Sequence, residues 1–392
     1  MITNNLYTFE TKFKSKMKMY PRIIYPVITK KIFKGKAIII MGARQTGKTT
    51  LTKLLTKKRK EIVLSLNADE LIVRTQLQDA SIATLKQIIG KAKIIVIDEA
   101  QRIPNVGITL KLIIDNFPDV QLIVTGSSAL DLASEINEPL TGRKWEYNLF
   151  PISWEEFRAI HNYSEAQTML EQRLIFGMYP DVINNSGDEK EVLSSLANSY
   201  LYKDLLNYKG IRKPELLEQL LKALALQMGN EVSYNELSTL LKIDKITIAN
   251  YIELLEKSFI VFRLNSYSSN VRNEIAKGKK IYFYDNGIRN SIIQNYNPLD
   301  MRTDVGVLWE NFLLSERVKF NHYHQRLARP YFWRTTAQQE IDYIEESAGE
   351  LSAYEFKWNK KAKNKFPSGF VKNYKLKESK IISPDNFEEF IM

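Results

Sequence analysis

The first third of the chain alternates short apolar runs with longer amphipathic stretches. Strands that alternate with helices form a parallel sheet with helices on both faces, so this pattern predicts an α/β domain. The domain should span residues 1–152 and begin with a basic N-terminal arm. The predicted strands lie at residues 37–41, 62–66, 93–97, 121–125 and 145–150, and the predicted helices at residues 49–57, 81–90 and 109–116.

The rest of the chain divides into three further regions. Residues 153–230 have a mostly helical pattern. Residues 231–304 show helix, tight turn, helix and β-hairpin in the order of a winged helix. Residues 305–392 begin with an apolar helix and continue with short strands, which predicts a last α+β unit.

One loop between a strand and a helix has the spacing of a phosphate-binding loop. The letters GARQTGKT at residues 42–49 fit the pattern G-x-x-x-x-G-K-[ST]. Glycines let such a loop curl until its backbone N–H groups point at phosphate oxygens. We expect Lys48 to neutralise the β- and γ-phosphates of ATP, and the Thr49 hydroxyl to ligate Mg²⁺. The predicted nucleotide-binding residues are Gly42, Ala43, Arg44, Gln45, Thr46, Gly47, Lys48, Thr49 and Thr50.

A second motif supplies acids at the same edge of the sheet. Four β-branched residues at 94–97 predict a central buried strand, and Asp98 and Glu99 follow them directly. Parallel α/β sheets bind ligands at the carboxyl ends of their strands. We therefore expect Asp98 to hold Mg²⁺ through water, and Glu99 to orient and polarise the attacking water.

Two further residues are candidates for catalysis. Thr125 ends a strand, where a polar side chain can contact the γ-phosphate or the attacking water; the alternative is that it caps the next helix. Arg143 precedes the last strand and could stabilise transition-state charge in the site of a neighbouring subunit. The alternative for Arg143 is a surface arginine paired with Glu138 or Glu146.

Five segments carry a resemblance of about residues 20–160 to the AAA+ ATPases. They are GARQTGKTT at 42–50, IIVIDEAQ at 94–101, IVTGSS at 123–128, LTGR at 140–143 and LFPISWEEF at 149–157. The chain is most similar to a prokaryotic subgroup with an uncharacterised C-terminal module. The resemblance implies Walker A and Walker B motifs, sensor 1 at Thr125 and an arginine finger at Arg143. It also implies ATPase activity, often in a homo-oligomer, with Arg212 as a candidate sensor 2 arginine.

The predicted winged helix has two surfaces that could meet duplex DNA. Its second helix should present Lys245, Thr247, Asn250 and Glu253, a mildly basic set. Its wing should be more basic, with Arg272, Lys277, Lys279 and Lys280. Winged helices also serve as protein–protein modules or as lids over ATP, so DNA contact and a structural role are both open.

Four charged residues near the C-terminus follow a nuclease-like order: Glu310 on a helix, Asp342 on a strand, and Glu355 with Lys357 on the next strand. Residues 305–360 thereby resemble the PD-(D/E)xK nuclease superfamily, with Ile341 where the superfamily usually has Pro. The resemblance implies a restriction-endonuclease-like fold and a second Mg²⁺ site held by the three acids, with Lys357 positioning a water. The alternatives are an inactive relative that only binds, and chance alternation of charges on an edge strand.

Composition narrows the chemistry further. The chain has no cysteine, which excludes disulfides, thiolate zinc sites and a cysteine nucleophile. His322 and His324 lie two residues apart without a cysteine or acid cluster nearby, so we expect an exposed pair rather than a metal site. No apolar run approaches the ~20 residues that span a bilayer. These features favour a cytoplasmic protein without a membrane partner.

The net charge leaves the partner open. The formal charge is +11, which attracts polyanions such as nucleic acid. Lysine, isoleucine and asparagine are all abundant, as an AT-rich genome would produce, so charge alone adds little. Three hypotheses follow: an ATP-driven enzyme that moves its C-terminal domains on a partner, a nucleotide-gated DNA-binding protein or nuclease, and a signalling scaffold with slow ATPase activity.

Overall fold

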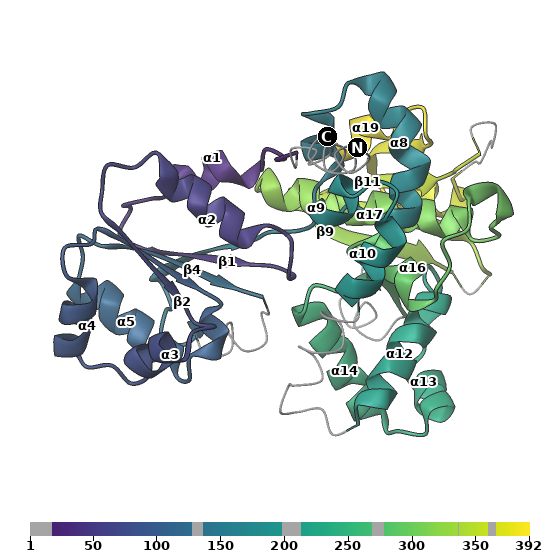
Figure 1. Ribbon diagram of the computed structural model, residues 1–392. Helices are drawn as coiled ribbons and strands as arrows, with labels where there is room; N and C mark the ends of the chain where they lie inside the picture. Colours follow the sequence, from purple (N-terminus) through teal and green to yellow (C-terminus); the bar gives the residue numbers. More distant parts are fainter. Residues whose placement is uncertain (1–17, 128–135, 198–212, 269–277, 336, 360–365) are drawn as a thin grey trace, which may run out of the picture.

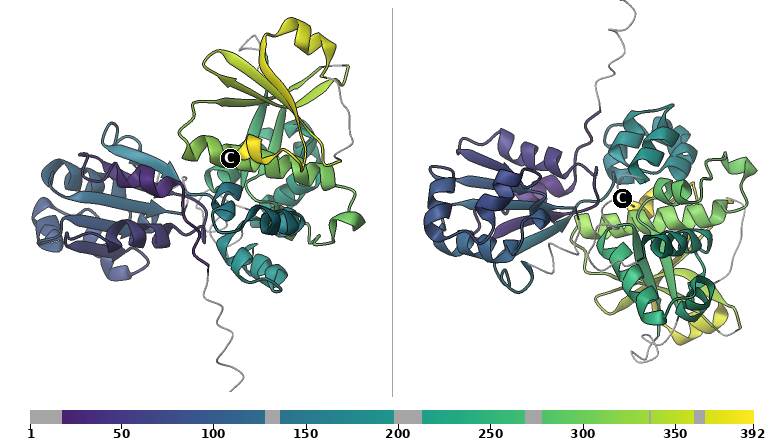
Figure 2. Two further views of the ribbon diagram at one scale, coloured as in Figure 1. Left: turned by 90° about the horizontal axis from the view of Figure 1, so that it is seen from above. Right: turned by 60° about the horizontal axis from the view of Figure 1, so that its bottom comes forward.

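Two lobes make up the computed structural model (Figure 1), which describes residues 18–127, 136–197, 213–268, 278–335, 337–359 and 366–392. The N-terminal lobe is built around a parallel sheet, and the second lobe around a mixed sheet with many helices (Figure 2). A short segment after the last strand of the first sheet connects the two.

The sheet of the N-terminal lobe is all parallel, with strand order β2-β3-β4-β1-β5. Three of its strands are almost wholly buried, because continuous apolar runs suit strands covered on both faces. The strands are β1 (Ala37–Met41), β2 (Val63–Asn67), β3 (Ile94–Asp98), β4 (Gln121–Gly126) and β5 (Lys144–Asn148). The surrounding helices are α1 (Ile24–Thr29), α2 (Lys48–Lys57), α3 (Leu71–Leu77), α4 (Ile82–Ile89), α5 (Val106–Asn116) and the 3₁₀ turn η1 (Ala100–Arg102).

The predicted parallel α/β fold is confirmed, with strand positions correct to within two residues. Helix α3 was not predicted. Its sequence begins with Leu71 and Ile72, which are largely exposed, so the apolar positions do not mark a single buried face.

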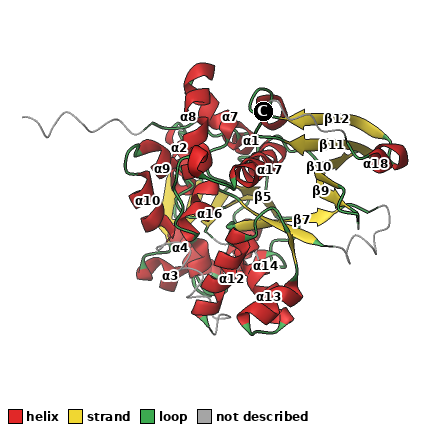
Figure 3. Ribbon diagram, turned by 90° about the vertical axis from the view of Figure 1, so that its right-hand side faces the viewer, coloured by secondary structure: helices red, strands yellow, loops and turns green. Residues whose placement is uncertain are grey.

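The second lobe contains a seven-stranded sheet in the order β12-β11-β10-β9-β7-β8-β6 (Figure 3). Its strands are β6 (Glu231–Val232), β7 (Val261–Ser266), β8 (Lys279–Phe283), β9 (Arg329–Arg334), β10 (Glu340–Ser347), β11 (Glu350–Phe356) and β12 (Leu376–Ile382). Its helices are α7 (Trp154–Arg158), α8 (Tyr163–Phe176), α9 (Pro180–Asn184), α10 (Glu189–Leu196), α12 (Pro214–Leu226), α13 (Tyr234–Leu241), α14 (Lys245–Lys257), α16 (Asn286–Ile292), α17 (Val305–Tyr323), α18 (Ser368–Asn373) and α19 (Glu388–Ile391), with the 3₁₀ turn η3 (Leu299–Met301).

The sheet continues across the predicted domain boundary between residues 304 and 305. Strand β7, from the hairpin of the predicted winged helix, pairs in parallel with β9, with Asn265 opposite Tyr331. Strands β6, β7, β8 and the C-terminal strands are therefore one sheet. The local sequence pattern of either segment does not predict this pairing, because it joins residues 66 positions apart in the sequence.

The segment that leaves β5 binds along helix α17. The backbone N–H of Asn148 donates to Nε2 of His322 at 2.9 Å, and the N–H of Trp154 donates to Glu316 at 2.7 Å. Between them, the ammonium of Lys319 donates to the carbonyl of Ile152 at 3.2 Å. One helix of the second lobe thus satisfies the backbone of the connection, which fixes how the lobes meet.

His322 is therefore not the exposed residue that the sequence suggested. Only His324 is exposed, and its ring contacts Glu155 at 2.8 Å. Burial lowers the pKa of His322 to about 4. The neutral ring is needed for Nε2 to accept the hydrogen bond from Asn148.

We expect acid to destabilise the contact between the lobes through His322. Because the folded-state pKa lies below the ordinary value of about 6.5, the stabilisation is complete above pH 6.5 and is lost as the pH falls towards 4. Urea unfolding should show a loss of roughly 2 kcal/mol between about pH 7.5 and pH 4.5 that His322→Gln abolishes. The matched substitution His324→Gln, on the exposed ring, should leave that loss in place. An equal pH dependence in His322→Gln and wild type would contradict the assignment.

Candidate nucleotide-binding site

The loop after β1 is shaped by close approach of the backbone. A Cβ atom at Gly42 would lie 2.1 Å from the carbonyl oxygen of Leu149, so no side chain fits there. Gly47 has φ of +96°, in the left-handed region that favours glycine, and it immediately precedes helix α2. The two glycines of the motif thus allow the loop to curl back onto the start of the helix.

Lys48 is buried at the base of this loop. Its ammonium donates to the carbonyls of Gly42 at 2.9 Å and Ala43 at 3.0 Å. The Thr46 hydroxyl donates to the same Ala43 carbonyl at 2.8 Å. The remaining predicted loop residues, Arg44, Gln45, Thr49 and Thr50, are half-buried or exposed. The loop backbone therefore holds the Lys48 ammonium. An anion bound in the loop would contact this ammonium.

The structure brings Thr49, Asp98 and Thr125 together. One carboxylate oxygen of Asp98 accepts from the Thr49 hydroxyl at 2.8 Å, and the other accepts from the Thr125 hydroxyl. Thr125 is fully buried. Mg²⁺ prefers hard oxygen ligands, so the adjacent hydroxyl of Thr49 and carboxylate of Asp98 fit that ion. The side chain of Thr125 is directed at Asp98.

Glu99 follows in a left-handed conformation, with φ of +54°. Its backbone N–H donates to the Thr125 hydroxyl at 3.3 Å, and its carboxylate accepts from Nε2 of Gln101 at 2.6 Å. The same Nε2 donates to the Ser127 hydroxyl at 2.7 Å. Gln101 therefore holds Glu99 and is itself bonded to Ser127. The sequence suggested no role for either residue, although both lie inside the motifs at 94–101 and 123–128.

Arg143 lies at the end of the sheet opposite to the phosphate-binding loop. Ala37, at the start of β1, pairs with Lys144, whereas the phosphate-binding loop follows the end of β1. The guanidinium of Arg143 forms an ion pair with Asp115 at 2.7 Å, rather than with Glu138 or Glu146. Arg143 is thus separated from Lys48 and Asp98 of the same chain by the length of a strand.

Arg22, which the sequence did not suggest, joins the loop to the second lobe. Its guanidinium donates to the carbonyl of Thr46 at 2.7 Å and to the carbonyl of Phe150 at 2.6 Å. It also donates to Glu156 at 3.0 Å and to the hydroxyl of Tyr323 at 3.0 Å. All three guanidinium nitrogens are used, in a buried position. No signal around Arg22 could reveal these partners, which lie up to 301 residues away in the sequence.

The four charged residues predicted near the C-terminus lie close to one another, and a further cation, Lys280, lies among them. Lys357 lies 2.9 Å from Glu355 and 3.7 Å from Asp342. Glu310 lies 3.3 Å from the ammonium of Lys280. Lys280 also pairs with Glu340, and the Tyr282 hydroxyl donates to Glu310. Each acid of the cluster therefore has a cation or a donor of this chain beside it.

Burial dominates the electrostatics of this carboxylate cluster. It raises the pKa of Glu310 to about 7, although the ammonium of Lys280 opposes the shift. Burial and the charge of Asp342 together raise the pKa of Glu355. Within the described ranges, no three His, Asp or Glu side chains are arranged to hold one metal ion. The second metal site at Glu310, Asp342 and Glu355 stays a prediction.

The predicted DNA-facing residues of the winged helix are only partly available. Lys280 is buried in the carboxylate cluster, so its assignment to an exposed wing was wrong. Lys279 lies over the ring of Tyr234, and Glu253 on α14 pairs with Lys257 at 2.6 Å. Lys245 and Asn250 are exposed, while Thr247 is bonded to Asp244 at the start of α14. Arg272, Lys277 and Arg212 lie outside the described residues.

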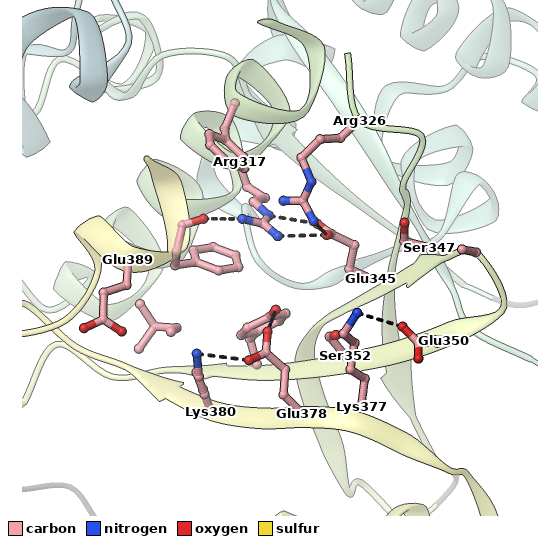
Figure 4. A pocket seen from close by; sticks show the side chains of 15 residues that line it. Arg317, Arg326, Glu345, Ser347, Glu350, Ser352, Lys377, Glu378, Lys380 and Glu389 are labelled. Atoms are coloured by element: carbon pink, nitrogen blue, oxygen red, sulfur yellow. Dashed lines mark hydrogen bonds and ion pairs between the residues drawn. The ribbon is translucent and has the colours of Figure 1, made fainter. Parts of the chain in front are cut away.

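A separate pocket opens beside α17 and α19, against strands β11 and β12 (Figure 4). Arg317 holds Glu345 through two bonds of 2.8 Å, and Arg326 reaches the same carboxylate at 3.1 Å. Lys380 pairs with Glu378 at 3.0 Å. These charges are satisfied within the protein, and none of the residues predicted for either site lines the pocket.

Comparison with known proteins finds matches to three domain families, each over part of the chain. Residues 34–158 match the AAA domain, and residues 167–299 and 305–388 match two domains of unknown function, DUF8612 and DUF4143. An uncharacterised protein of Mycobacterium tuberculosis is 26% identical over 334 residues, which cover 83% of this chain and 71% of the relative. An uncharacterised protein of Methanocaldococcus jannaschii is 25% identical over 285 residues, covering 67% and 64%.

A solved structure agrees with the fold. A Walker-type ATPase of Pyrococcus abyssi superposes with a TM-score of 0.52 at 15% identity, covering 70% of this chain and 96% of that protein. The AAA match, the parallel sheet and the loop at residues 42–49 together support a P-loop ATPase of the AAA class. In the part of the chain that is described, no helix is both long and apolar enough to span a bilayer.

The close approach at Gly42 predicts a stability defect. In Gly42→Ala the new methyl group must displace the Leu149 backbone, and overpacking of this kind costs about 1–3 kcal/mol. Urea unfolding should report that loss. Gly306→Ala is the matched control, because its Cβ meets nothing within 4 Å and the position lies in helix α17. It should be neutral or slightly stabilising; equal effects of the two substitutions would contradict the geometry.

Proposed function

We propose that the chain binds ATP with Mg²⁺ at residues 42–50 and hydrolyses it to ADP and phosphate. The observation that supports this most strongly is the carboxylate of Asp98, which accepts hydrogen bonds from both Thr49 and Thr125. These three residues come from different segments of the sheet and its first helix. They meet at the carboxyl edge of the strands, where α/β sheets bind ligands.

Each residue then has a distinct task. The loop N–H groups and Lys48 hold the phosphates, and Thr49 and Asp98 hold Mg²⁺, which neutralises phosphate charge. Glu99 accepts a proton from the water that attacks the γ-phosphorus. The bond from that phosphorus to the bridging oxygen breaks, and ADP leaves with the electron pair. Thr125 keeps the Asp98 carboxylate oriented through its hydroxyl.

Arg143 can serve hydrolysis only in the site of a neighbouring copy. It lies at the sheet edge opposite its own loop, with its side chain partly exposed beside Asp115. An arginine supplied by a neighbour would stabilise transition-state charge and would make turnover depend on assembly. We therefore include a homo-oligomer in the proposal.

ATP turnover tests the assignment of Glu99. Glu99→Gln should lower kcat at least about 100-fold because the general base is lost, while binding of a fluorescent ATP analogue persists. Glu70→Gln, an exposed acid on the same lobe, is the matched control and should turn over like wild type. Wild type that neither binds nor hydrolyses ATP would overturn the proposal. Slow turnover with tightly held nucleotide would favour the signalling scaffold instead.

A second candidate function rests on the C-terminal cluster. Glu310, Asp342, Glu355 and Lys357 come from α17, β10 and β11, in the order of the PD-(D/E)xK resemblance. This supports a nuclease-like module that ATP binding would gate. Lys280 argues against metal-dependent cleavage, because its ammonium already neutralises Glu310 and Glu340.

We expect the wild-type protein to leave supercoiled plasmid intact in Mg²⁺ or Mn²⁺. The physical reason is that Lys280 is buried and competes with a divalent ion for the carboxylate of Glu310. Agarose gels with increasing protein provide the measurement. Nicking that is lost in Glu355→Ala and kept in Glu350→Ala, an exposed acid on the same strand, would establish a nuclease and overturn this expectation.

A further inference from the structure

The positive charge of this chain is concentrated in one short region. Residues 18–62 contain thirteen Lys and Arg and a single acid, Glu61, which gives a net charge of +12. The net charge of the entire chain is +11, so the remainder is close to neutral. A genome-wide preference for lysine codons would spread the excess along the chain. The concentration therefore points to a local cause.

Six of these residues lie on neighbouring segments of the surface, which we call the lysine face. Its members are exposed and come from the turn after α1, the outer side of α2 and the turn after α2. The two turns meet where the guanidinium of Arg59 lies 6.0 Å from the ring of Phe33. The lysine face consists of Lys30, Lys34, Lys53, Lys57, Lys58 and Lys60.

The cations of the lysine face are not neutralised locally. None of the six forms an ion pair with an acidic residue that the structure describes, whereas Lys93, Arg102 and Arg143 of the same lobe are each paired. At its border, Lys31 and Lys36 lie 4.2 Å and 4.5 Å from the ring of Trp145. A set of like charges left without acids costs stability through repulsion, so a polyanionic partner would relieve it.

The chemistry of the face fits phosphates on a regular backbone. Lysine is a compact point charge that binds phosphate without the fixed fork of arginine, so it carries little sequence selectivity. Lys53 and Lys57 lie one helical turn apart, about 6 Å along α2. Each strand of duplex DNA places a phosphate about every 3.4 Å along its axis, so neighbouring lysines can reach separate phosphates.

A membrane surface fits the face less well. Peripheral binding usually adds apolar side chains that enter the lipid boundary. Phe33 is exposed at 41%, but Arg59 lies over its ring, and the exposed Ile62 beyond the second turn is a single aliphatic side chain. The face therefore offers much charge and little apolar anchor, which favours nucleic acid.

We propose that the lysine face binds the phosphate backbone of duplex nucleic acid without reading its sequence. The face lies along the half of α2 that is away from the phosphate-binding loop, and Lys57 lies about 14 Å along the helix from Lys48. Nucleotide and nucleic acid would thus occupy the two ends of one helix. The proposal adds a site to the DNA-partner hypothesis, and binding without ATP tests it separately from hydrolysis.

Fluorescence anisotropy with a duplex of about 30 base pairs, titrated at several KCl concentrations without nucleotide, provides the test. Wild type should bind any sequence, with affinity that falls steeply as salt rises. Combined glutamine substitutions at Lys53, Lys57, Lys58 and Lys60 should weaken binding at about 50 mM salt at least about tenfold. They should also flatten the slope of log affinity against log salt by up to about 3.6, about 0.9 for each phosphate that a lysine no longer neutralises.

The control carries the same number of substitutions on exposed lysines elsewhere. It combines Lys86→Gln, Lys111→Gln, Lys190→Gln and Lys222→Gln, and it should bind DNA like wild type. Circular dichroism and ATP-analogue binding confirm that both variants are folded. Absence of binding by wild type, or equal loss in both variants, would overturn the proposal. Tighter binding to phosphatidylserine vesicles than to DNA at the same salt would also overturn it, in favour of a membrane surface.

Discussion

The buried guanidinium of Arg22 is the interaction on which the arrangement of the two lobes depends. It meets the nucleotide-binding loop at Thr46, the exit of β5 at Phe150, helix α7 at Glu156 and helix α17 at Tyr323. Removing one partner of a buried ion pair costs about 3–5 kcal/mol, because the other charge stays buried without compensation. Glu156 is fully buried and also bonds the N–H groups of Ile23 and Ser153, so it cannot turn to water. The contact is therefore specific in geometry as well as strong.

Much of the N-terminal lobe could be predicted because its signals are local. Strands such as β1 and β3 are continuous apolar runs, and the loop motif requires glycine at Gly42 and Gly47 for reasons of backbone conformation alone. The roles proposed for Lys48, Thr49 and Asp98 rest on the spacing of their motifs. What the local pattern could not provide was the set of side chains that hold those residues. Gln101 orients Glu99 through bonds that depend on where Ser127 lies after folding.

The second lobe was harder to predict because its determinants are distant in sequence. The pairing of β7 with β9 merges two predicted units into one sheet, although each unit has a consistent pattern by itself. The environment of Lys280 is likewise set by residues distant in sequence. The residues just before it in sequence are basic, which suggests an exposed wing, yet its charge is balanced by Glu310 and Glu340 from other elements. A buried lysine is recognised only when its partners are placed beside it.

Helix α17 connects the two polar centres of the molecule. Tyr323 at its C-terminal end bonds Arg22, and Glu310 near its start bonds Lys280. The two residues are thirteen positions apart, about 20 Å along a helix. Between them, Glu316 and Lys319 form a buried ion pair of 2.7 Å that holds the segment leaving β5. Helix α17 therefore connects the bonds of Arg22 to those of the carboxylate cluster through direct contacts at three points. This gives the proposed coupling between nucleotide and C-terminal module a continuous physical route.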